Sequence, residues 1–84
     1  MTLELSFGAH ALVAANDGLD PVACAERYAT ALREALAREW PDATITVTFT
    51  HDRAPTHVTA PDPAIERTAL DLAWVVRQMH PWAG

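Results

Sequence analysis

Long apolar runs are missing from this chain of 84 residues. The longest run near the C-terminal end is the stretch 72–76, whereas a membrane-spanning helix needs about 20 apolar residues. The N-terminus also lacks the basic start and apolar core of a signal peptide. These absences predict a single cytoplasmic domain over 1–84 that does not enter a membrane, close to the lower size limit for folding without staples.

Lysine, cysteine and glycine are scarce as well. All six basic residues are arginines, and eleven acidic residues bring the net charge to −5. That balance argues against a nucleic-acid partner, because binding a phosphate backbone needs a cationic surface. Cys24 is the only cysteine, which excludes an intramolecular disulfide and a thiolate metal site. The three glycines form no phosphate-binding loop, so no nucleotide cofactor is expected.

Groups that could carry catalysis are few and scattered. Ser6, the sole serine, falls in the middle of a predicted strand and not on a sharp glycine-flanked turn. His51 and His57 flank one loop, but strand alternation places them on opposite faces, where they cannot share an ion. The sequence therefore predicts no metal, no cofactor and no catalytic residues.

Alternating apolar and polar residues predict strands at three places. The first strand, 2–7, buries Leu3, Leu5 and Phe7, and the second, 44–50, buries Ile45, Val47 and Phe49. Four threonines form the opposite face of 44–50, which is typical of a sheet covered on one side only. Residues 56–60 are predicted to be a short antiparallel partner of 44–50 across a hairpin loop. Residues 10–15 are left open, either as an extra strand or as a continuation of the first.

Two amphipathic segments predict helices. The first begins at Asp20 and Pro21, which suit a helix start, and ends at Trp40, because a following proline disfavours helical geometry. The second covers 63–80. The stripe that it is predicted to turn toward the core consists of Ile65, Ala69, Leu72, Val76 and Met79.

The resulting order is strand, helix, strand, strand, helix. It predicts an α+β two-layer sandwich in which both helices cover one face of a mixed or antiparallel sheet and the threonines line the other. An extra strand after the first would lie within 10–15. The order resembles part of a ferredoxin-like arrangement without its last strand, and this topological resemblance implies no function.

Leu70 and Trp74 lie on the wrong side of the second helix. Being four residues apart, they are predicted to stack on each other and to point almost directly away from the core stripe. An indole off the core face needs another surface to cover it. Arg67 and Arg77 are expected to frame it, and Trp82 in the tail is a second accessible aromatic residue. We expect these five residues to bind a partner; the alternative is that Trp74 packs on the first helix of the same chain.

Large apolar side chains are few for a chain of this length, which favours a homodimer or a protein partner as a source of added stability. The alternative is an ordinary small monomer of modest stability. We therefore expect a small acidic interaction module without catalysis, acting as a regulator, an inhibitor or an accessory subunit. Small acidic proteins of this kind often act as regulators or inhibitors, including those carried by phages and mobile elements. The acidic residues that would face a basic groove on the partner are Glu26, Glu34, Glu39 and Asp42.

A second hypothesis stays open beside this one. A small enzyme or ligand-binding domain would use the loop over 8–20, and its pocket would be lined by His10, Asp17 and Asp20. Such a pocket would favour this hypothesis, and a filled, featureless loop would remove it.

Overall fold

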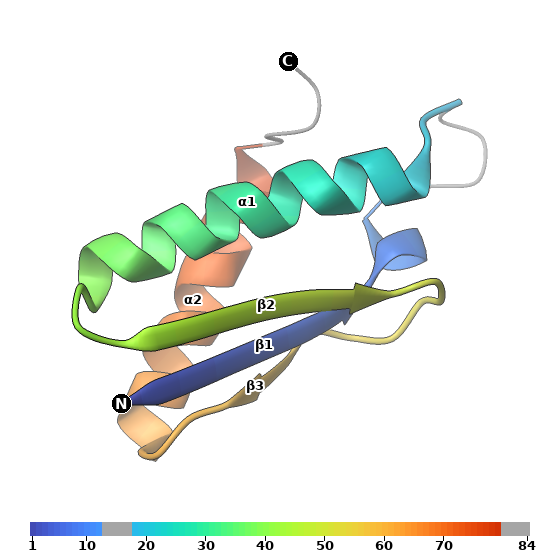
Figure 1. Ribbon diagram of the computed structural model, residues 1–84. Helices are drawn as coiled ribbons and strands as arrows, with labels where there is room; N and C mark the ends of the chain where they lie inside the picture. Colours follow the sequence, from blue (N-terminus) through green and yellow to red (C-terminus); the bar gives the residue numbers. More distant parts are fainter. Residues whose placement is uncertain (13–17, 80–84) are drawn as a thin grey trace.

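Each predicted helix and strand is present in the computed structural model, which describes residues 1–12 and 18–79 (Figure 1). The elements in chain order are β1 (Thr2–Gly8), a short 3-10 helix η1 (Ala9–Ala11), α1 (Pro21–Glu39), β2 (Thr44–Thr50), β3 (His57–Thr59) and α2 (Pro63–Gln78). The α+β class and the order of the elements are confirmed.

The two helices start at equivalent aspartates. The Asp20 carboxylate accepts a hydrogen bond of 3.0 Å from the backbone N–H of Val22, and the Asp62 carboxylate accepts one of 2.7 Å from Ala64. Each aspartate is followed by a proline in the first turn, where the missing N–H costs nothing. The sequence thus sets both starting points by local chemistry.

β1 is the central strand of a mixed sheet with the order β2-β1-β3. It runs parallel to β2 and antiparallel to β3. The predicted hairpin between 44–50 and 56–60 is therefore wrong, because β1 lies between the two strands. Alternation reports which face a strand buries and carries no information about its neighbour.

The loop after β2 explains how the chain reaches the far side of β1. It passes the C-terminal end of β1, where the N–H of Gly8 donates to the carbonyl of Ala54 at 3.0 Å. The N–H of His10 donates to the carbonyl of Asp52 at 2.9 Å. These two bonds tie the loop to the end of β1 and bring β3 alongside it.

The segment left open in the sequence begins as η1. Residues 9–11 form a 3-10 turn, closed by a hydrogen bond of 3.3 Å from the N–H of Leu12 to the carbonyl of Ala9. Residues 10–12 are therefore not a strand, and 13–15 lie outside the described residues. β1 and β2, the two strands joined by α1, pair directly with each other. In a ferredoxin-like sheet another strand lies between the corresponding two strands, so this sheet differs from that arrangement.

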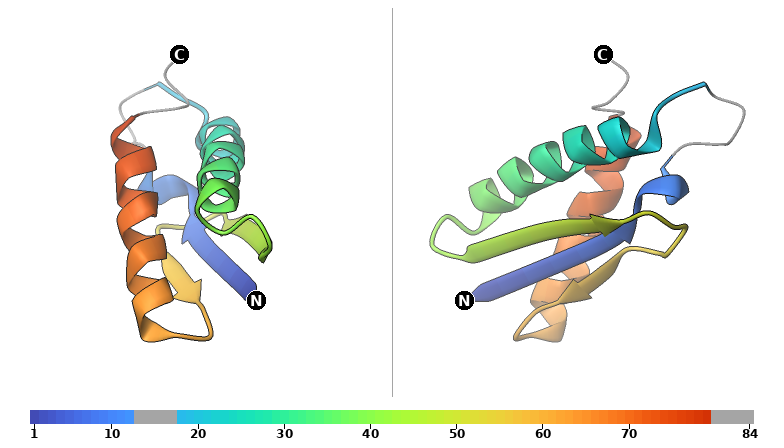
Figure 2. Two further views of the ribbon diagram at one scale, coloured as in Figure 1. Left: turned by 90° about the vertical axis from the view of Figure 1, so that its left-hand side faces the viewer. Right: turned by 45° about the vertical axis from the view of Figure 1, so that its right-hand side comes forward.

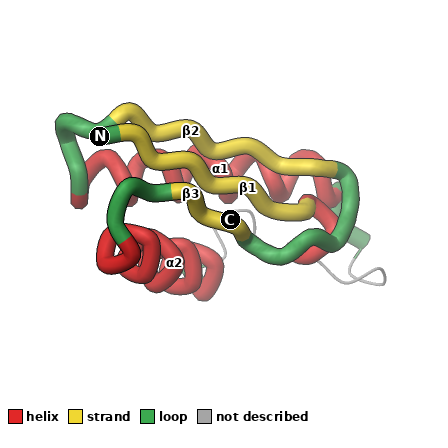
Figure 3. Tube along the Cα trace, turned by 90° about the horizontal axis from the view of Figure 1, so that it is seen from below, coloured by secondary structure: helices red, strands yellow, loops and turns green. Residues whose placement is uncertain are grey.

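Both helices cover one face of the sheet (Figures 2 and 3). α1 packs over β2 and beside α2, and α2 packs over β3. The four threonines of β2 are exposed on the opposite face, as predicted. The large side chains buried between the layers are Leu3, Leu5, Phe7, Tyr28, Leu32, Leu36, Val47, Val58 and Val76. No described helix is long and apolar enough to cross a membrane.

α2 turns most of its predicted stripe toward the core, since Ala69 and Val76 are buried and Ile65 and Leu72 are half-buried against it. Ala69, Ala73 and Val76 are buried, whereas Met79 is 74% exposed, so its predicted place in the core is wrong. Because alanine side chains are small, this face of α2 comes close enough for the Tyr28 hydroxyl to donate a 2.9 Å hydrogen bond to the carbonyl of Ala73. A helical wheel weighted by large side chains cannot detect a contact made by small ones.

Candidate protein-interaction surface

Leu70 and Trp74 are exposed on the flank of α2 that faces away from α1. Leu70 is 37% exposed and Trp74 is 61% exposed. Both line a shallow depression of about 170 Å³. We call its lining the Trp74 surface, which comprises Tyr28, Thr56, Leu70, Ala73, Trp74 and Arg77. The two residues singled out by the sequence therefore share one surface feature.

The opposite flank of α2 is the one that faces α1. There Val76 and Met79 line a groove together with Ala31 and Ala35 of α1. Trp74 lies on the other side, and α1 reaches the Trp74 surface through Tyr28. Trp74 is therefore not packed against α1, which was the alternative to a partner-binding role, because 61% of the residue is exposed to solvent.

Arg77 has a structural role in addition to its place on this surface. Its Nη2 donates a hydrogen bond of 2.7 Å to the carbonyl of Ala11, which ties the end of α2 to η1. Burial raises the pKa of the Tyr28 hydroxyl, and the nearby Arg77 charge opposes that rise. The Arg77 side chain is therefore held by a hydrogen bond to the backbone of η1, and the Tyr28 hydroxyl by one to the backbone of α2.

Arg67 and Trp82 complete the predicted set. Arg67 is exposed, and it lies on the Trp74 side of α2 because seven residues correspond to about two helical turns. Trp82 lies outside the described residues. The structure thus brings together Leu70, Trp74 and Arg77, with Arg67 further along the same flank.

Aromatic packing holds Tyr28, the α1 residue that lines the Trp74 surface. The ring of Phe7 on β1 meets Tyr28 edge to face, with centroids 5.0 Å apart, and lies 5.8 Å from the ring of Phe49 on β2. Such pairs contribute about 0.5–1.5 kcal/mol beyond burial alone. Tyr28, which lines the depression, thus has a ring contact with Phe7 and a hydrogen bond to Ala73.

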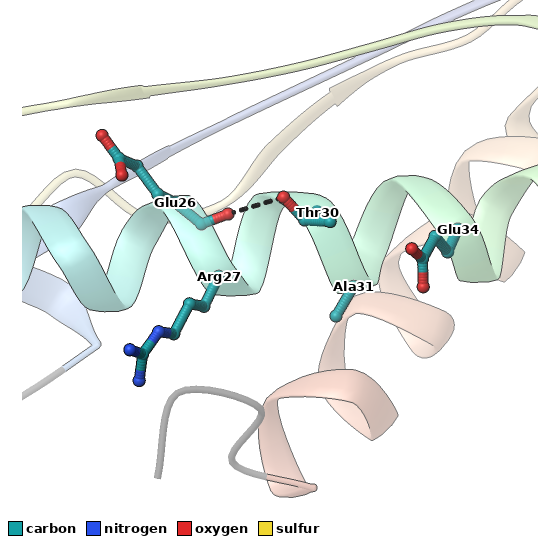
Figure 4. Close-up of a pocket in the computed structure, with 5 residues that line it drawn as sticks. All are labelled: Glu26, Arg27, Thr30, Ala31 and Glu34. Atoms are coloured by element: carbon teal, nitrogen blue, oxygen red, sulfur yellow. Dashed lines mark hydrogen bonds between the residues drawn. The ribbon is translucent and has the colours of Figure 1, made fainter. Parts of the chain in front are cut away.

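The acidic residues on α1 do not converge. In Figure 4 the side chain of Glu26 points away from the side of the helix on which Arg27, Ala31 and Glu34 lie. Thr30, between the two glutamates, donates a hydrogen bond of 3.0 Å to the carbonyl of Glu26. The hollow lined by these residues is shallow and carries both signs of charge. This face therefore gives less support to an acidic docking surface than the Trp74 surface gives to an apolar one.

The residues of the alternative site around 8–20 serve the fold where they are described. The carboxylate of Asp20 caps α1, and the backbone of His10 bonds the loop after β2. Asp17 lies outside the described residues. Within 1–12 and 18–79, no cluster of three or more histidine, cysteine, aspartate or glutamate side chains could hold a metal ion.

His51 and His57 also separate as the strand pattern predicts. The His51 ring lies 6.1 Å from that of Phe49 at the end of β2. His57 is paired with Ser6 in the β1–β3 register, one residue before the inward-facing Val58. Its side chain is therefore on the threonine side of the sheet.

A second exposed apolar area was missed from the sequence. Val75 of α2 is 54% exposed, and Met79, which lines the groove shared with α1, is 74% exposed. The pattern that assigned Met79 to the core concealed this area.

Known proteins offer no comparison, since no protein family, curated protein or solved structure matches the chain.

Proposed function

We propose that this chain is a small cytoplasmic protein-interaction module without catalysis, which regulates, inhibits or completes a larger protein. The observation that carries the proposal is the exposed Leu70–Trp74 pair beside the buried ring of Tyr28. Tryptophan is the side chain most often found at energetic centres of protein interfaces, and its exposure on a small monomer carries a solubility cost.

The Trp74 surface suits an apolar side chain of the partner that fits beside the indole, above Leu70. Arg67 on the same flank adds a positive charge in an otherwise acidic chain, so a carboxylate next to that apolar side chain would be favoured. The partner segment is therefore expected to combine an apolar anchor with an acidic neighbour.

Affinity capture from the native host with matched variants tests this function. Trp74→Ala and Leu70→Ala should each reduce recovery of the same partner by about tenfold or more, as expected for a central interface residue. Val75→Ala is the control, because Val75 is also exposed and apolar but points away from the Trp74 surface.

Circular dichroism of all three variants checks that the fold is kept. Equal loss of the partner in the Val75→Ala variant, or unchanged recovery in the Trp74→Ala variant, would contradict the proposed surface.

A further inference from the structure

The outer edge of β2 carries backbone groups that the described part of the chain does not pair. β2 is an edge strand in the order β2-β1-β3, and its register with β1 runs without interruption from Thr44 to Thr50. Figure 2 shows β2 at the border of the sheet on the side away from β3 and α2. This edge and the Trp74 surface therefore lie on opposite sides of the molecule.

The hydrogen bonds to β1 identify which backbone groups point outward. The N–H of Thr44 donates to the carbonyl of Met1 at 2.8 Å, so Thr44 faces β1. Because backbone groups alternate along a strand, Thr46, Thr48 and Thr50 face β1 as well. The N–H and C=O groups of Ile45, Val47 and Phe49 consequently point away from the sheet.

β2 also lacks the features that usually protect an edge strand. Natural edges carry lysine, proline, inward charges or a bulge. The strand Thr-Ile-Thr-Val-Thr-Phe-Thr has no charge and no proline, and its continuous register leaves no room for a bulge. Such an edge readily adds another strand.

The sequence of β2 is self-complementary about Val47. Antiparallel pairing with a second copy would place Val47 against Val47, Ile45 against Phe49, and threonine against threonine on the other face. The three outward-facing residues would then exchange about six backbone hydrogen bonds across a two-fold axis. This symmetry about Val47 is what pairing with a second copy of the chain requires.

Burial along this edge is incomplete in the single chain. Leu3, Leu5 and Phe7 of β1 are at most 3% exposed, whereas Ile45 and Phe49 of β2 are only half-buried. Cross-strand Ile45–Phe49 pairs would cover both side chains on the helix side. We infer that β2 pairs with β2 of a second copy, giving a homodimer with a continuous six-stranded sheet and all four helices on one face.

Charges placed on the exposed threonine face test the pairing and its register. Thr46 and Thr48 would lie opposite each other across the two-fold axis, so Thr46→Lys with Thr48→Lys creates two like-charge pairs. The dissociation constant should rise by about tenfold or more. Thr46→Lys with Thr48→Glu creates two opposite-charge pairs and should keep the dimer.

His57→Lys with Thr59→Lys is the matched control, because it puts the same two residues at the same spacing on the far edge strand, β3. Sedimentation equilibrium should give twice the chain mass of 9.1 kDa for the native protein, the control and the Lys/Glu variant. The Lys/Lys variant should shift toward one chain mass. Trp74→Ala should stay dimeric, which separates this inference from the proposed partner surface.

Amide hydrogen exchange gives a readout that needs no variant. The amides of Ile45, Val47 and Phe49 should be protected in the native protein and lose protection on dilution. A native protein that is monomeric with these amides exchanging freely would overturn the inference. So would a folded Lys/Lys variant that stays dimeric, and loss of the dimer in the Lys/Glu variant would overturn the register.

Discussion

The hydroxyl of Tyr28 on α1 donates a buried hydrogen bond of 2.9 Å to the backbone carbonyl of Ala73 on α2. The two residues are 45 positions apart in sequence. This bond joins the two helices directly beneath the exposed indole of Trp74, so it links the stability of the helix layer to the shape of the candidate interaction surface.

Tyr28→Phe removes that bond and keeps the ring that packs on Phe7. We expect the free energy of unfolding to fall by about 0.5–1.5 kcal/mol, as measured by urea denaturation. Thr30→Val is the control, since it removes an exposed hydroxyl that donates to a helix carbonyl at 3.0 Å and should cost less than about 0.5 kcal/mol. If both variants lose the same free energy of unfolding, the buried Tyr28 hydrogen bond contributes no more stability than the exposed Thr30 bond.

Val76 and Met79 both belong to the predicted stripe of α2, but only Val76 is buried. Val76→Ala should destabilise the protein by about 1–3 kcal/mol, because Val76 is buried and its truncation leaves a cavity. Met79→Ala should change the stability by less than about 0.5 kcal/mol, because Met79 is largely exposed. Thermal unfolding of both variants measures the contrast, and a larger loss for Met79→Ala would place Met79 in the core, as the sequence predicts.

Gly8 is confined by the loop that crosses the end of β1. A Cβ atom at this position would overlap the backbone nitrogen of Ala54 and the backbone carbonyl oxygen of Asp52. Gly8→Ala should therefore cost about 1–3 kcal/mol and displace the backbone NMR signals of 52–54.

Gly18→Ala provides the comparison for that variant. Among the described residues, no atom lies within 4 Å of a Cβ placed at Gly18, but its φ of 70° is strained for alanine, at about 1–2 kcal/mol. The signals of 52–54 should stay in place. Their displacement in the Gly18→Ala variant would argue against a local overlap as the cause at Gly8.

Asp52 makes the same loop sensitive to acid. The hydrogen bond from the Thr50 hydroxyl, at 2.7 Å, lowers the pKa of this carboxyl, with further contributions from the N–H of Ala54 and from His10 and His51. Because the folded pKa lies below the unfolded one, the carboxylate stabilises the fold above about pH 4. That contribution is lost as the pH falls through the folded value.

The difference in melting temperature between the native protein and an Asp52→Asn variant should accordingly be constant near neutral pH and shrink below about pH 4. In a Thr50→Val variant, the carboxyl carbon of Asp52 should titrate at higher pH, as followed by NMR. A titration unchanged by Thr50→Val would show that the hydroxyl is not the main cause of the lowered pKa.

The candidate site was predictable only in part. The helical spacing of α2 predicts that Leu70 and Trp74 point away from the core, and both are exposed in the structure. Local periodicity is sufficient for this prediction. The bond from Arg77 to Ala11 and the bond from Tyr28 to Ala73 were not predictable, because both join segments that are distant in sequence. The place of β2 at an outer edge also depended on the order of strands, which alternation does not encode.

By itself, the sequence determined the parts of this protein that depend on neighbouring residues. Aspartate–proline pairs start both helices, alternation sets the buried face of each strand, and the threonines mark the open face. Tertiary structure decided which strands are neighbours, that Met79 stays outside the core and that β2 lies at an outer edge of the sheet. These features depend on contacts between distant segments, in which small side chains such as Ala69 and Ala73 count as much as large ones.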